Sequence, residues 1–192
     1  MTGQDVYTGA PSASCELATG CAPSGLMRPG YAMFPGTFDP PTLGHIDIIQ
    51  RCAALYKKVY VVIADNIAKK TLFTAEERKA FLEESLKLQG QSNQSNIEVH
   101  IWPGLVVDFA REHNIGVMIR GVRSQVDFGY EFELAETNKQ ICPSLEVLFM
   151  PTNPNYFLIR SSTIKEMAKF GADISAMVPQ VVIEALKAKV NG

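Results

Sequence analysis

Apolar and polar positions along this chain follow two periodicities, one typical of strands and one typical of helices. From about residue 29 onward, short runs rich in β-branched and aromatic residues predict five strands, at 31–34, 58–64, 97–101, 117–120 and 145–150. The second run, KVYVVIA, is apolar at successive positions, which favours a strand covered on both of its faces. The predicted sheet is therefore expected to be buried.

Segments with helical periodicity fill the spaces between these runs. The first begins near Gly44, after the turn-rich stretch GTFDPPTLGH, and the others are predicted at 74–88, 105–114, 126–140, 161–170 and 179–190. Thr74 followed by Glu77 is a capping-box pattern, and the helix at 161–170 is expected to be capped by its serines and to stop at Gly171. This alternation predicts the α/β fold class, as a single Rossmann-like domain in which a five-stranded parallel sheet has helices on both faces.

Composition and charge narrow the function classes. The 192 residues are 46% hydrophobic and 20% charged, and a formal net charge of −2 argues against broad binding of nucleic acid or anionic membranes, so any anion site has to be local. The four cysteines form no CxxC pair and no metal-type spacing with the three histidines, which indicates reduced thiols in a cytoplasmic protein. No apolar run approaches the roughly 20 residues of a membrane span.

Residues 1–28 differ from the rest of the chain. They are rich in Gly, Ser, Thr, Ala and Pro, show no periodicity and contain no basic residue before Arg28, so they resemble neither a secretory signal nor a transit peptide. We expect a disordered leader or an added extension here, with Met27 as a candidate first residue. The folded domain is predicted at residues 29–192.

Polar clusters follow four of the predicted strands. They read GTFDPPTLGH, DNIAKK, RGVRSQVDFGYE and YFLIRSSTIKE. Ligands of open parallel sheets bind at the carboxyl ends of the strands, where the strand order reverses. The four clusters are therefore expected to converge on one site.

The first cluster places Thr37 and His45 around the start of a helix. Donors at a helix N-terminus favour an anion such as a phosphate. In a structural alternative, Asp39 and Thr42 only cap and turn the chain while His45 packs in the core. The cluster by itself is compatible with both interpretations.

Lysines and hydroxyl groups in two other clusters could contact the same anion. Lys69 and Lys70 follow a buried-type strand, although either one could simply be a solvated surface residue. The hydroxyl residues at 161–163 open a helix beside Arg160. Helix capping explains one of them, and the group together predicts a second phosphate site.

Two arginines lie at the end of the fourth strand. Guanidinium groups match phosphate oxygens with paired donors, and Gly121 permits close backbone approach. Asp127 and Glu131 could neutralise Arg120 and Arg123 in an ion-pair network. We expect Arg120 to bind ligand and the pair of Arg123 and Asp127 to be partly structural.

Several familiar enzyme classes are not supported. The chain contains neither a GxxxxGK[ST] loop nor a GxGxxG fingerprint, and no Ser-His-Asp arrangement is legible. What remains is a set of phosphate ligands without an obvious nucleophile. This favours transfer between two bound substrates.

These motifs resemble a known family. MFPGTFDPPTLGHIDI is similar to the signature of nucleotidyltransferases with a [TH]xGH motif, here at 42–45, and KKTLFTAEER, IRGVRSQVDFGYE and SSTIKEMA resemble the bacterial phosphopantetheine adenylyltransferases over about residues 31–190. The resemblance implies transfer of the adenylyl group of ATP to 4′-phosphopantetheine, giving dephospho-coenzyme A and pyrophosphate. It also implies Mg²⁺ held mainly by the ATP phosphates, a homohexamer, and coenzyme A as a feedback inhibitor.

The resemblance assigns roles to individual residues. His45 would stabilise the charge developing on the transferred phosphoryl group and the leaving pyrophosphate. Thr37 would orient the nucleophilic phosphate and contact ATP, and Lys69 and Arg120 would hold the phosphopantetheine phosphate. A protonated histidine beside a lysine and an arginine suits such charge stabilisation. The implied catalytic residues are thus His45, Lys69, Arg120 and Thr37, and the implied phosphopantetheine-binding residues are Thr37, Lys69, Val106 and Arg120. The implied ATP-binding residues are Thr37, Phe38, His45, Gly121, Val122, Arg123, Glu131, Tyr156, Phe157, Leu158, Ile159, Arg160, Ser161 and Ser162.

The chain departs from the family pattern at Arg160, where many relatives have a serine, and counting back from Phe73 favours Lys69 over Lys70 as the binding lysine. A nicotinamide mononucleotide adenylyltransferase or a cytidylyltransferase would keep the first and last motifs but not the arginine block. A nucleotide-binding module without turnover is an alternative of another class, in which His45 only packs. A class I aminoacyl-tRNA synthetase is disfavoured because no domain remains to hold tRNA.

Overall fold

The computed structural model of the protein describes residues 28–65, 70–88 and 96–190. The strands are β1 (Arg28–Gly36), β2 (Lys58–Ala64), β3 (Ile97–Trp102), β4 (Ile115–Val122) and β5 (Glu146–Pro151). The α-helices are α1 (Leu43–Leu55), α2 (Ala75–Leu88), α3 (Val106–Glu112), α4 (Gln125–Ile141), α5 (Ser161–Lys169) and α6 (Gln180–Val190), and a short 3-10 helix, η2, covers Pro154–Tyr156.

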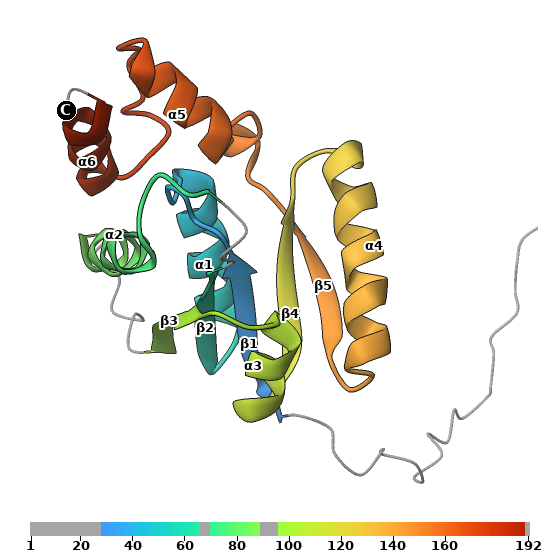
Figure 1. The fold of residues 1–192 in the computed structure, drawn as a ribbon. Helices are drawn as coiled ribbons and strands as arrows, with labels where there is room; N and C mark the ends of the chain where they lie inside the picture. Colours follow the sequence, from blue (N-terminus) through green and yellow to red (C-terminus); the bar gives the residue numbers. More distant parts are fainter. Residues whose placement is uncertain (1–27, 66–69, 89–95, 191–192) are drawn as a thin grey trace, which may run out of the picture.

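The five strands form one parallel sheet in the order β3-β2-β1-β4-β5 (Figure 1). The chain builds the sheet from β1 outward to β3, then returns to the other side of β1 to add β4 and β5. The strand order therefore reverses between β1 and β4. Such a reversal separates the connections at the carboxyl ends of these two strands and leaves room for a ligand there.

Helices cover both faces of the sheet. On one face α1 and α2 bury Ile49 and Leu82 against the strands, and on the other face α3 buries Phe109. A third cluster joins α2, α5 and α6 around Phe73 and Ile164. Figure 1 shows α5 and α6 beyond the carboxyl ends of the strands, where α6 lies next to α2 and to α5.

The predicted α/β architecture is confirmed, because all five strands and all six helices form where periodicity indicated. The strands β1 and β4 extend further at both ends than predicted. The capping box of α2 is present, since the Thr74 backbone N–H donates to Glu77 at 2.8 Å and the Glu77 N–H donates to Thr74 Oγ1 at 3.2 Å. The predicted leader, apart from Arg28 in β1, lies outside the described residues.

The expected serine cap of α5 is wrong. The residue that caps α5 is Arg160, in extended conformation, and it makes no side-chain capping hydrogen bond. Gly171 follows this helix with a φ of 70°, as expected for a glycine that ends a helix. Among the described residues, none of the helices combines the length and apolarity that crossing a bilayer requires.

Candidate active site

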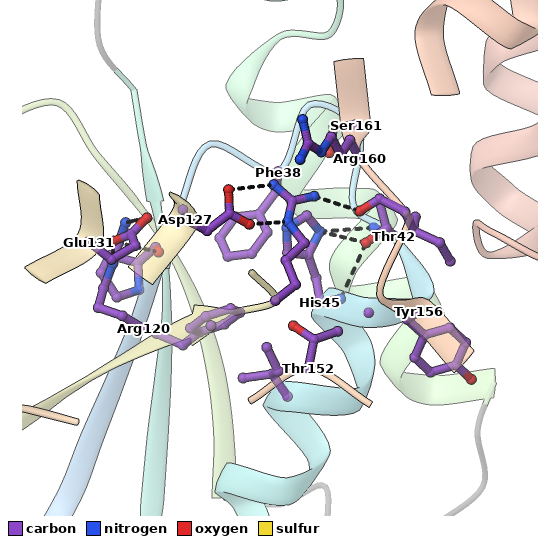
Figure 2. A pocket seen from close by; sticks show the side chains of 18 of the residues that line it. Phe38, Thr42, His45, Arg120, Asp127, Glu131, Thr152, Tyr156, Arg160 and Ser161 are labelled. Atoms are coloured by element: carbon purple, nitrogen blue, oxygen red, sulfur yellow. Dashed lines mark hydrogen bonds and ion pairs between the residues drawn. The ribbon is translucent and has the colours of Figure 1, made fainter. Parts of the chain in front are cut away.

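A cavity of about 450 Å³ opens at the point where the strand order reverses (Figure 2). Its walls come from the ends of β1 and β4, the first turns of α1 and α5, and the inner side of α4. The lining residues include Pro35, Gly36, Phe38, Thr42, Gly44, His45, Arg120, Gly121, Arg123, Asp127, Glu131, Thr152, Tyr156, Arg160, Ser161 and Ser162. Segments more than 100 residues apart in the sequence thus share one hollow.

His45 is part of the N-terminal cap of α1. The Thr42 side chain accepts a hydrogen bond from the His45 backbone N–H at 3.3 Å, and the Thr42 backbone N–H donates to His45 Nδ1 at 3.0 Å. Together they make a capping box in which the ring nitrogen replaces the usual Glu or Gln oxygen. Because Nδ1 accepts, the neutral ring carries its proton on Nε2. The cap thereby fixes the tautomer.

The imidazole of His45 is neutral at physiological pH. Burial of the ring, and secondarily the positive charge of Arg123, lower the pKa of His45 from its ordinary 6.5 to about 4. Phe38 contributes to this burial, since its ring meets the His45 ring edge-on with 5.1 Å between centroids. The protonated histidine expected from the sequence is therefore incorrect for the free protein, in which the cavity receives an uncharged N–H donor.

The two arginines of the third motif are held by carboxylates from α4. Arg120 donates to both oxygens of Glu131, with 2.9 Å between Nη2 and Oε1, and to the Pro35 carbonyl at 3.1 Å. Arg123 Nε lies 2.5 Å from Asp127 Oδ2, and Arg123 Nη1 donates to the Ile159 carbonyl at 2.8 Å. The predicted ion-pair network is confirmed, and it pre-orients both guanidinium groups at the cavity wall. Figure 2 shows Arg120 beside Glu131.

The N-terminus of α5 faces the same cavity without a side-chain cap. The first amide groups of any α-helix have no intrahelical acceptor, and Arg160 provides none. The Ser161 hydroxyl instead donates to the Pro40 carbonyl at 2.9 Å, which joins α5 to the loop between β1 and α1. The amides of this first turn and the Ser162 side chain are therefore placed to meet an anion.

Glycine permits the close approach of two other walls. A Cβ atom on Gly44 would lie 3.3 Å from Tyr156 Cβ, and one on Gly121 would lie 2.5 Å from Ile48 Cδ1. The first glycine lets η2 pack on the start of α1, and the second lets α1 pack on β4. The close approach expected at Gly121 is thus made by a protein side chain.

Two buried charges that sequence reasoning did not assign to the site hold its loops together. Asp39, 5% exposed, accepts hydrogen bonds from the backbone N–H groups of Leu72 and Phe73 at about 3.0 Å and pairs with Lys165. Burial opposes ionisation of Asp39, but Lys165 and the two amides outweigh it and lower the pKa. The alternative in which Asp39 only caps and turns the chain therefore missed its contacts with Leu72, Phe73 and Lys165.

Arg78 is the second of these charges. It is 1% exposed and donates to the carbonyls of Thr37, Phe73 and Thr74 and to the Asp65 carboxylate, with 2.8 Å to Thr37. A signal was present in the sequence, because an arginine within an amphipathic helix next to a capping box can turn inward. Its partners are brought close only by the fold.

Most of the residues predicted to bind ATP line the cavity. They are Phe38, His45, Gly121, Arg123, Glu131, Tyr156, Ile159, Arg160, Ser161 and Ser162. The cavity lining does not include Thr37, Val122, Phe157 or Leu158; Leu158 is 83% exposed, and Thr37 lies between two lining residues.

The residues predicted to bind phosphopantetheine are more scattered. Arg120 lines the cavity. Val106 instead begins α3 and packs in the hydrophobic cluster on that side of the sheet. Lys69 lies outside the described residues. Thr152 and Tyr130 line the cavity without having been predicted, although Tyr130 lies within the motif RGVRSQVDFGYE.

The charges of the cavity suit an anionic ligand. Three guanidinium groups face two carboxylates, and the histidine is neutral, so the wall carries an excess of positive charge. The exposed helix N-terminus adds further partial positive charge. Hydrogen-bond donors thus surround the hollow from α1, β4 and α5, which is an arrangement suited to phosphate groups.

Comparison with known proteins agrees with this geometry. The family model described as cytidylyltransferase-like matches residues 33–167. A phosphopantetheine adenylyltransferase of Dictyoglomus thermophilum is 45% identical over 158 residues, covering 82% of this chain and 93% of its own. One of Clostridium perfringens is 40% identical over 165 residues, covering 86% and 96%. A solved nicotinic acid mononucleotide adenylyltransferase of Plasmodium falciparum shares the fold at a TM-score of 0.57, with 16% identity and coverage of 82% and 94%.

Proposed function

Because the chain belongs to the phosphopantetheine adenylyltransferase family, we propose that it transfers the adenylyl group of ATP to 4′-phosphopantetheine. A phosphate oxygen of phosphopantetheine attacks the α-phosphorus of ATP, and the bond from that phosphorus to the α,β-bridging oxygen breaks. The products are dephospho-coenzyme A and pyrophosphate. The observation that carries this proposal is the cavity in which the N-termini of α1 and α5 meet two oriented arginines.

The chain's own groups act by placing donors where negative charge develops. His45 donates through Nε2–H to the phosphoryl group in transfer, and its neutral state avoids the need to bury an unpaired cation. The first amides of α5, with Ser162, would hold the departing phosphates. Direct phosphoryl-type transfer gains most of its rate from such positioning and electrostatic stabilisation.

We assign the two carboxylate-paired arginines to different substrates. Arg120 lies between β1 and α4, and we assign it to the phosphate of phosphopantetheine. Arg123 lies nearer α5 through its bond to the Ile159 carbonyl, and we assign it to ATP. Each carboxylate partner would exchange part of its hydrogen bonding for the incoming phosphate. We also retain Lys69, Thr37 and Val106 as phosphopantetheine ligands on the strength of the motif alone.

The site is compatible with Mg²⁺ that is bound mainly through the phosphates of the nucleotide. Among the residues that the structure describes, no three His, Cys, Asp or Glu side chains gather into a metal-binding group, and the two carboxylates of the cavity are bonded to arginines. The oxygen ligands that Mg²⁺ requires would then come from phosphates and water. Its contribution when bound would be to neutralise charge on the phosphates.

One assay separates the proposal from its nearest rival. Purified protein with Mg²⁺ and ATP should release pyrophosphate when phosphopantetheine is supplied, and should not do so with nicotinamide mononucleotide. Turnover with nicotinamide mononucleotide alone would contradict the proposal. ATP binding without turnover on either acceptor would favour the non-catalytic module.

We further propose that the protein is a homohexamer inhibited by coenzyme A. Supporting self-association, α4 and β5 expose apolar side chains, of which Val126 is 83% and Phe132 48% exposed. Phe132→Glu should lower the solution mass measured by light scattering, whereas Leu55→Glu, at a more exposed apolar position on α1, should not. Coenzyme A shares the pantetheine arm and an adenosine phosphate with the product, so it would compete for the same cavity.

A further inference from the structure

Two side chains one turn apart attach α5 to the loop that precedes α1. The Ser161 hydroxyl donates to the Pro40 carbonyl at 2.9 Å, and Lys165 Nζ lies 2.7 Å from Asp39 Oδ2. The first contact involves a residue of the cavity wall. The second does not, since neither Asp39 nor Lys165 is among the cavity-lining residues.

Asp39 joins three segments at once. Besides Lys165, its carboxylate accepts hydrogen bonds from the backbone N–H groups of Leu72 and Phe73. It belongs to the turn between β1 and α1, so this single buried group connects that turn, the segment before α2, and α5. Lys165 is therefore linked through Asp39 to the loop that carries the histidine cap.

The geometry points to Lys165 as a positioning residue that, through Asp39, sets the uncapped N-terminus of α5 opposite His45. This inference rests on the proposed function, because it concerns the alignment of ATP phosphates between these two helix ends. Lys165 itself is not among the residues that line the cavity. A misplacement of about 1 Å can lower the rate of a transfer reaction by about 100-fold even when the altered residue is remote from the chemistry.

Removing the charge of Lys165 would leave the Asp39 carboxylate without its ion-pair partner. Lys165→Met would leave Asp39 buried beside two amide donors but without its cation. In the described part of the chain, α5 would then keep its Ser161 hydrogen bond to the loop before α1 and the packing of Ile164. We expect kcat to fall by about 10- to 100-fold, with a smaller rise in KM for ATP, because alignment matters most in the transition state. Lys165→Arg should recover most of the lost kcat, since a guanidinium can also reach the carboxylate.

Lys169 provides the matched control. It lies one turn further along α5, beside the same surface hollow as Lys165, and forms no ion pair within the described part of the chain. Lys169→Met removes the same charge from the same helix without touching Asp39. It should leave kcat within about twofold of the wild type.

A neutral pair keeps the test decisive if Lys165→Met does not fold. In Asp39→Asn with Lys165→Met, the amide oxygen still accepts from Leu72 and Phe73 and no charge is buried alone. Pyrophosphate release would be measured for each variant whose circular dichroism matches the wild type. A drop in kcat of at least about tenfold in the neutral pair, absent in Lys169→Met, supports the inference.

Two results would overturn it. One is wild-type kcat in the neutral pair or in folded Lys165→Met, and the other is an equal loss in Lys169→Met. Absence of turnover in the wild-type protein itself would count against the proposed function, so the two failures are distinguishable.

Discussion

The N-termini of α1 and α5 meet at the same cavity, but their first turns are completed differently. In α1 the N–H groups of Thr42 and His45 donate to each other's side chains, and the Leu43 N–H donates to the Met177 carbonyl at 3.0 Å. In α5 the capping position is taken by Arg160, which offers no acceptor. One helix end therefore presents a single side-chain donor of fixed tautomer, and the other presents its backbone amides. A ligand with several phosphates can use both.

Substitution of His45 should have the largest effect on turnover, because it removes the side-chain donor at the N-terminus of α1. His45→Gln keeps a side chain that can complete a capping box but lacks the imidazole donor, whereas His45→Ala loses both. Both variants should bind ATP and lose about 100- to 1000-fold in kcat, which corresponds to about 3–4 kcal/mol. Only His45→Ala should also lose about 1 kcal/mol of stability. Pyrophosphate assays and urea unfolding measure the two effects; a near-wild-type rate in His45→Gln would rule out the donor role.

Acidification should weaken the capped end of the cavity. The folded pKa of His45, about 4, lies below its ordinary 6.5. The stabilising contribution is therefore complete above pH 6.5 and is lost as pH falls toward 4, because the unfolded chain takes up the proton first. The loss amounts to about 3 kcal/mol by linkage. Urea unfolding at pH 7 and pH 5 should show a smaller pH effect in His45→Gln, and an unchanged effect would mean that other groups account for it.

Capping α5 should make the two ends alike. Arg160→Asp supplies an acceptor for the first-turn amides and a charge that repels phosphate, so KM for ATP should rise by about tenfold or more while α5 gains about 1 kcal/mol. Arg160→Asn caps without charge and should have an intermediate effect. Arg160→Ala removes only the guanidinium. If Asp and Ala gave the same KM, the open amides would not be ligands.

Loss of the Thr42 hydroxyl should have the smallest effect. Thr42→Ala removes the acceptor for the His45 N–H and should lower stability by about 1 kcal/mol. Thr74→Ala makes the matching loss in α2, whose capping residues do not line the cavity. Both variants should unfold at a lower temperature than the wild type, and only Thr42→Ala should also lower kcat. Equal kcat values would show that the ring of His45 is held without the hydroxyl.

Periodicity and local pairing predicted most of the fold. The five strands, the six helices and the Thr74 capping box depend on neighbours within a few residues, and these were all identified. The arginine, histidine and serine motifs also met in one cavity, because carboxyl ends of parallel strands share an edge. The resemblance indicated which residues of these motifs bind which substrate, and the parallel sheet explains why the motifs lie close together.

Properties that depend on distant contacts were not predictable. The neutral state of His45 follows from burial against Phe38 and from Arg123, which is 78 positions away in the chain. The roles of Asp39 and Arg78 depend on partners 33 and 41 residues away. The serines of α5 were expected to cap it, but Arg160 occupies that position and Ser161 bonds to Pro40 instead. In each case the deciding partner is adjacent only after folding.

The backbone conformation of Phe38 is costly for stability, whereas its side chain serves the candidate active site. Its φ of 51° lies in the left-handed region, which is costly for a residue with a side chain and is natural for glycine. The same residue places an aromatic ring on His45 and is 2% exposed. Glycine at position 38 would relax the backbone but admit water to the imidazole, so a thermostabilisation effort that replaces left-handed residues should leave this one in place.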